Sequence, residues 1–134
     1  MNAIRHLPLV GCVALLYAAI AVFGAEAPVH PVLSIGLPSG ASWSLSLGDL
    51  LLVIAVVSLY FEVLKATRTS QASVLDHILS LFSFVACLFG FLFVSALGTS
   101  TFLLIMVMAL FDVIAGFTVT ISTARRDFSI PDRQ

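Results

Sequence analysis

The residues from Ser100 to Ser122 form a predominantly apolar stretch that is long enough to cross a lipid bilayer as one α-helix. About 20 residues of helix span the hydrocarbon core of a membrane. One carboxylate, Asp112, lies near the middle of this stretch. A charged side chain at that depth is costly unless it is paired or neutralised. The stretch therefore predicts a membrane-spanning helix with an acid that the rest of the chain must shelter.

The composition extends this prediction to the whole chain. Of its 134 residues, 60% are hydrophobic and only 10% are charged, whereas about 25% of the residues in soluble domains are charged. We therefore expect an all-α membrane protein, with a single domain made of a small bundle of four transmembrane helices. The apolar stretches predict spans over residues of about 7–25, 49–66, 74–97 and 100–122.

The basic residues indicate how these helices are oriented. They fall in three clusters that are separated by pairs of apolar stretches: Arg5, then Lys65 and Arg68, then Arg125, Arg126 and Arg133. Because cytoplasmic loops carry an excess of Lys and Arg, we expect both termini and the tail 123–134 in the cytoplasm. The outer segments contain neither residue type. No basic face remains that could bind a nucleic acid.

Two interpretations of residues 1–27 stay open, a retained first helix and a cleaved signal peptide. Ala25-Glu26-Ala27 resembles a signal-peptidase site after an apolar run. Pro28 after the cut and the length of the run favour retention. Small residues also recur at helical spacing and predict close contact with another helix: Ala14, Ala18, Ala21 and Ala25.

Residues 26–48 form the one sizeable segment that we expect on the outer side. Apolar side chains alternate with small ones on both sides of the turn sequence Pro38-Ser39-Gly40. This period of two predicts a short β-hairpin at the membrane interface, anchored among the headgroups by Trp43. An irregular loop is the alternative, because an isolated two-stranded hairpin is marginally stable. Ser46 or Asp49 is positioned to cap the helix that follows.

Polar residues gather toward the cytoplasmic ends of the second and third helices. Lys65 follows Glu62 at the i+3 position, which predicts an ion pair within the second helix. Asp76 and His77 lie in the first turn of the third helix, where a carboxylate suits the positive helix terminus. We expect His77 to be solvated there.

Asp112 shares one helix face with small residues, so a neighbouring helix can approach it and offer hydrogen bonds. A residue count from the cytoplasmic boundary places four polar side chains at a similar depth: Ser58, Tyr60, Ser80 and Ser83. We expect Asp112 to bond to Ser83 or Tyr60. Glu62, Asp76 and His77 would then lie between this pair and the cytoplasm.

Three roles for Asp112 stay open. It can be a structural acid that fixes the packing of the helices, or a group that binds a proton or cation in a transport pathway. It can also face a partner subunit and pair with a basic residue there, because we expect no basic residue of this chain at its depth.

The chain carries no sequence motif for metal, nucleotide or covalent chemistry. CxxC, HExxH, a glycine-rich phosphate loop and a Ser/His/Asp set are all missing from it. The sequence therefore predicts no metal site, no cofactor and no catalytic residue. An enzyme is the least favoured class.

Four segments from Leu37 onward resemble a family of small, uncharacterised inner-membrane proteins of proteobacterial type. These segments are LPSGASWSLSLGDLL, FEVLKATRTS, VLDHILS and ALFDVIAGFTVTISTARRDFSI. The resemblance covers about the last hundred residues. It implies a polytopic protein of the bacterial cytoplasmic membrane, and it implies no activity.

We therefore expect a non-enzymatic accessory or assembly subunit of a membrane complex, or a small homo-oligomer. Its partners would be the lipid bilayer and another membrane subunit or a second copy. The alternative is a small transporter or channel component in which Asp112 binds protons or cations. In that case Glu62, Asp76 and His77 would line the cytoplasmic approach.

Overall fold

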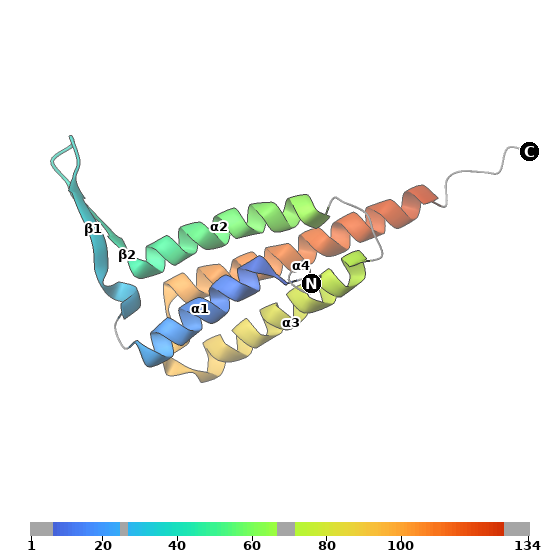
Figure 1. Cartoon of the computed structure of the whole chain (residues 1–134), viewed down its shortest axis with the longest axis horizontal. Helices are drawn as coiled ribbons and strands as arrows, with labels where there is room; N and C mark the ends of the chain where they lie inside the picture. Colours follow the sequence, from blue (N-terminus) through green and yellow to red (C-terminus); the bar gives the residue numbers. More distant parts are fainter. Residues whose placement is uncertain (1–6, 25–26, 67–71, 128–134) are drawn as a thin grey trace, which may run out of the picture.

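The structure, a computed structural model, describes residues 7–24, 27–66 and 72–127. Its helices run side by side along the long axis, and a two-stranded sheet turns away from one end (Figure 1). The predicted helical fold with four α-helices is confirmed over these residues. The helices are α1 (Leu9–Phe23), α2 (Leu47–Ala66), α3 (Ala72–Phe93) and α4 (Ser100–Asp127).

Three of these helices, α2, α3 and α4, are long and apolar enough to cross a membrane. The remaining helix, α1, has 15 residues. A helix of that length rises roughly 22 Å, which is less than the hydrocarbon core of about 30 Å. The described residues therefore have the make-up of a multi-pass membrane protein with one shorter apolar helix.

Two helix ends differ from the expected spans by more than two residues. Helix α3 ends at Phe93, earlier than the expected residue 97, and a 3₁₀ turn, η3 (Ser95–Leu97), follows it. This turn brings Leu97 back into the core, where it is 4% exposed and lies against Gly90. At the other end of the molecule, α4 continues to Asp127, so the segment expected as a tail from residue 123 begins as helix.

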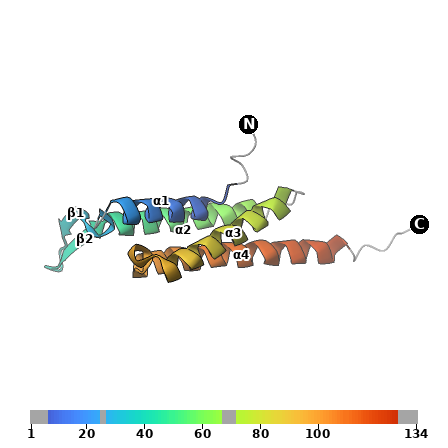
Figure 2. The same ribbon diagram turned by 90° about the horizontal axis from the view of Figure 1, so that it is seen from below.

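Helix α4 packs against each of the other three helices. Its buried residues Phe102, Ile105, Met106 and Ala109 recur at the spacing of one helix face. Figure 2 shows α1 and α2 on one side of the bundle and α4 on the other. In the same view α3 runs obliquely, with its first turns toward α2 and its last turns beside the start of α4.

The first helix contributes directly to this core. Tyr17 of α1 is 1% exposed and stacks on Phe102, with 5.6 Å between the ring centroids. Its hydroxyl shares a hydrogen bond of 2.7 Å with Thr99 Oγ1, which also accepts a bond from the backbone N–H of Phe102. Helix α1 therefore packs into the core of the bundle.

The predicted β-hairpin is confirmed. After a 3₁₀ turn, η2 (Ala27–Val29), strands β1 (Pro31–Gly36) and β2 (Ser42–Ser46) pair in antiparallel register. The backbone N–H of Gly40 donates to the carbonyl of Leu37 in the turn, and Gly40 adopts a φ of 83°. Glycine adopts this left-handed conformation without steric cost.

The hairpin passes into α2 without an intervening loop. The backbone N–H of Ser46 donates to Asp49 Oδ2 at 2.9 Å, and the backbone N–H of Asp49 donates to Ser46 Oγ at 3.1 Å. This reciprocal pair is a capping box, so the predicted cap is confirmed. It fixes the direction in which the hairpin leaves the helix.

We predict that Tyr17→Phe lowers the free energy of unfolding by about 1 kcal/mol, because it removes one buried hydrogen bond and leaves the ring in place. Thermal unfolding in detergent, followed by circular dichroism, measures the change. Tyr60→Phe is the matched control, since Tyr60 is 61% exposed. Equal losses in the two variants would contradict this role of Tyr17.

Candidate functional site

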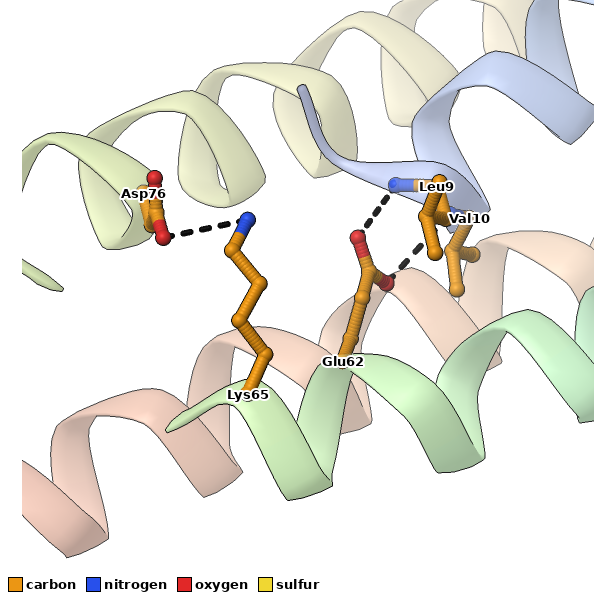
Figure 3. Close-up of polar contacts among 5 residues, drawn as sticks. All are labelled: Leu9, Val10, Glu62, Lys65 and Asp76. Carbon is orange, nitrogen blue, oxygen red and sulfur yellow. Dashed lines mark hydrogen bonds and ion pairs between the residues drawn. The ribbon is translucent and has the colours of Figure 1, made fainter. Parts of the chain in front are cut away.

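Glu62 of α2 points at the beginning of α1 (Figure 3). One carboxylate oxygen accepts the backbone N–H of Leu9, and the other accepts that of Val10 at 3.3 Å. Helix α1 begins after Pro8, which provides no side-chain cap. The first N–H groups of a helix have no partner within it and attract negative charge. Glu62, 5% exposed, therefore caps α1 from another helix.

Lys65 reaches in a different direction from Glu62 (Figure 3). Its Nζ lies 3.0 Å from Asp76 Oδ2, and the ion pair joins the end of α2 to the first turns of α3. The predicted ion pair between Lys65 and Glu62 is therefore wrong. The oxygens of Glu62 are occupied by the N–H groups of α1, and Lys65 lies one turn further along, beside α3.

Asp112 is 7% exposed, so its side chain faces the interior of this bundle rather than a partner subunit. A side-chain hydrogen bond joins it to Ser80 of α3, and His77 and Lys65 are close enough to attract its charge. The expectation that this chain places no basic residue near Asp112 is therefore wrong. Helix α3 crosses the bundle obliquely (Figure 2), and its residues His77 and Ser80 line one cavity with Lys65 of α2 and Asp112 of α4.

The two partners expected for Asp112 lie elsewhere. Tyr60 is 61% exposed on the outside of α2, with its ring edge-on to Phe61. Ser83 lies against Gly11 of α1, and a Cβ built at Gly11 would be 2.6 Å from its Oγ. Tyr60 therefore faces away from the bundle and Ser83 faces α1, so neither is the expected partner of Asp112.

His77 is 8% exposed, so the prediction that it is solvated is wrong. Its ring lies against Gly116 of α4, where any side chain would collide with the imidazole. The ring centroid is also 6.2 Å from that of Phe117. The missing side chain at Gly116 therefore makes the room that buries His77 between α3 and α4.

These polar groups surround a cavity of about 20 Å³, which has room for roughly one water molecule. The polar residues that line it form the polar cluster: Glu62, Lys65, Asp76, His77, Ser80 and Asp112. Each of its three carboxylates has a partner within the chain. In the described part of the chain, no buried side-chain nitrogen or oxygen lacks a hydrogen bond. The cluster therefore ties all four helices together at one end of the bundle.

The described residues contain no group of three His, Cys, Asp or Glu side chains arranged to hold a metal ion. The polar cluster can instead hold a proton or a water molecule among its carboxylates. Lys65, which the sequence analysis used to predict the orientation of the helices in the membrane, also lines this cavity. Arg5 and Arg68 lie outside the described residues, as do the side chains of Arg125 and Arg126.

A second cavity, of about 180 Å³, lies between α1 and α3. We call it the α1–α3 groove; its small residues are Gly11, Ala14 and Ala18 of α1 and Ala86, Cys87 and Gly90 of α3. The lining residues Leu15 and Phe82 are each 71% exposed, so the groove opens to the outside of the bundle. Two alanines of the predicted small-residue stripe, Ala14 and Ala18, therefore line a groove.

Three contacts of this site were not predicted from the sequence: the N–H groups of Leu9 and Val10, the bond from Ser80, and Gly116 beneath His77. The contact with Leu9 and Val10 could have been anticipated, because Pro8 precedes an apolar helix and has no side chain that can cap it. The other two depend on how α3 and α4 are rotated, which a single sequence does not specify.

Comparison of the chain with protein-family models, curated proteins and solved structures gave no match.

We predict that Glu62→Gln lowers the free energy of unfolding by about 1.5–3 kcal/mol, the range for hydrogen bonds to charged groups. The amide keeps one acceptor oxygen, so one of the two N–H groups at the start of α1 loses its partner. Thermal unfolding in detergent measures the change. Tyr60→Phe is the control, because the Tyr60 side chain is 61% exposed on the outside of α2. An unchanged stability of Glu62→Gln would contradict the capping role.

Proposed function

We propose that this protein is a non-enzymatic, multi-pass protein of the bacterial inner membrane that acts as an accessory or assembly subunit. The observation that carries the proposal is the α1–α3 groove, an apolar cavity of about 180 Å³ that opens to the outside of the bundle. The polar cluster supports it, because its carboxylates bind groups of their own chain.

The groove has the composition of a helix–helix contact in lipid. Helices associate in membranes through close packing, and small residues allow their backbones to approach. Glycine and alanine line the groove on both of its sides, and the apolar residues Leu15 and Phe82 flank it. A transmembrane helix of a partner subunit, or of a second copy, can pack closely against this groove because its lining is small and apolar.

The paired carboxylates support a structural role for the polar residues. An ionisable group within a membrane is costly unless it finds a partner. Glu62 binds α1, Asp76 binds Lys65, and Asp112 binds Ser80. Each of these contacts joins two different helices. Together they fix the positions of the helices, including α1 and α3, which form the groove.

The proposed topology has four helices in the membrane and both termini in the cytoplasm. It rests on the three clusters of basic residues and on the alternating direction of successive helices (Figure 1). Helix α1 is short, and Glu62 and Tyr17 fasten it to α2 and to the start of α4.

We predict that the protein extracted in mild detergent migrates as a complex, and that Ala86→Phe dissociates it because the new ring fills the α1–α3 groove. Native mass spectrometry of the tagged protein measures the mass of the complex. Ala19→Phe is the matched control, since Ala19 is exposed on α1 and does not line the groove. A monomeric native protein, or a complex that survives Ala86→Phe, would contradict the proposal.

A second candidate function, transport of protons or cations, is favoured by one observation. Three carboxylates and His77 line the cavity of about 20 Å³, and one of those carboxylates, Asp112, lies halfway along the span of α4. Carboxylates inside membranes commonly belong to proton relays. In this candidate, Asp112 binds the ion and Glu62, Asp76 and His77 lie on its path.

If the protein transports protons, the native protein in liposomes will carry a proton flux that Asp112→Asn abolishes, because the amide cannot bind and release a proton. A pH-sensitive dye inside the liposomes measures this flux. Asp49→Asn, at the opposite end of α2, should leave the flux unchanged. The absence of flux with native protein, or its persistence in Asp112→Asn, would remove this candidate.

A further inference from the structure

The register of the β-hairpin sorts its side chains onto two different faces. Leu33 pairs with Leu45 and Ile35 pairs with Trp43, and side chains directly opposite each other lie on the same face. The alternate pairs consist of small or polar residues, with Ser34 opposite Ser44 and Gly36 opposite Ser42. The hairpin therefore has one apolar face, formed by Leu33, Ile35, Trp43 and Leu45, and its paired residues on the other face are serine and glycine. Val32 lies at a register irregularity between Pro31 and Leu33 and is not paired.

The apolar face of the hairpin is not covered by the described part of the chain. Leu33, Ile35 and Trp43 are each 45–48% exposed. From residue 27 to residue 48 the sequence contains no Asp, Glu, Lys or Arg. A two-stranded hairpin is marginally stable in water, and this one exposes the large apolar side chains of its apolar face as well as Val32, which is 60% exposed. The apolar face of the hairpin is therefore expected to lie against an apolar environment.

The base of the hairpin is fixed at the end of a candidate membrane span. Strand β2 ends at Ser46 and α2 begins at Leu47, and the capping box of Ser46 and Asp49 holds the junction. The start of a membrane-spanning helix lies at the boundary between headgroups and acyl chains. Figure 1 shows the hairpin turned across the direction of the helices. It therefore extends along the membrane plane when α2 crosses the bilayer.

We propose that the hairpin is an in-plane membrane-binding arm, and that its apolar face binds the lipid bilayer at the boundary between headgroups and acyl chains. Its six-residue strand extends roughly 20 Å, so the arm enlarges the contact of the bundle with one leaflet. Tryptophan is the residue typical of this boundary. The serine and glycine face is left toward water. This lipid contact is independent of the α1–α3 groove and of any partner subunit.

The chain contains a single tryptophan, so its fluorescence reports on the arm alone. The test uses the full chain in vesicles of phosphatidylethanolamine and phosphatidylglycerol whose acyl chains are brominated near the carbonyl end. Amphipathic elements at an interface insert about 5–10 Å, to the depth of these bromines. We expect the brominated lipid to quench the emission of Trp43 strongly, relative to the same vesicles without bromine.

The matched control moves the tryptophan to the other face of the same strand with the double substitution W43F and S44W. We expect this variant to be quenched several-fold less than the native protein, because position 44 lies on the serine and glycine face. Circular dichroism checks that both proteins keep their helices. Equal quenching of the two proteins would overturn the proposed orientation.

The native protein alone also tests the proposal. Unquenched Trp43 emission in brominated vesicles would overturn it, and the apolar face would then belong to a second copy or to a partner subunit. A shift of mass in native mass spectrometry when Ile35→Lys is introduced would identify that second occupant. Quenching that Ile35→Lys abolishes, with the mass unchanged, would support the lipid contact.

Discussion

The packing of the bundle depends on one carboxylate that crosses from helix α2 to the first N–H groups of α1. The carboxylate of Glu62 and the first N–H groups of α1 satisfy each other's hydrogen-bonding requirement. Glu62 is buried and needs donors, while α1 begins after a proline and needs an acceptor. Their contact places the short helix α1 against α2, and Tyr17 can then reach the start of α4. The remaining polar groups arrange themselves around this contact, with Lys65 turned to Asp76 and Asp112 bound to Ser80.

Patterns that repeat along the chain predicted much of the fold. The apolar stretches gave the positions of the four helices, and the alternation around Pro38-Ser39-Gly40 gave the hairpin. The cap at Ser46 and Asp49 was predictable because both residues belong to one local motif. These features depend on neighbours in sequence, so the sequence carries their signal. The end of α3 was not predictable, because Leu97 turns back to fill a space that only the packed helices create.

The sequence predicted which polar residues lie near one another in the candidate site, but it did not predict which of them contact each other. Glu62, Asp76, His77 and Asp112 do line one cavity, because their distances from the ends of their helices fix their depth. The partners were wrong, because the rotation of each helix about its own axis decides them. Tyr60 has a suitable depth and points outward, whereas Ser80 points at Asp112. Lys65 has a local candidate partner three residues earlier, Glu62, and a distant partner in Asp76, and a linear sequence displays only the first.

Helix α2 joins the two ends of the molecule without a flexible joint. Its last turns carry Glu62 and Lys65, and its first turn is fixed to the hairpin through Ser46 and Asp49. Residues 47–62 of α2 correspond to roughly 24 Å of helix. Helix α2 therefore connects the polar cluster to the base of the hairpin directly, with no loop between them.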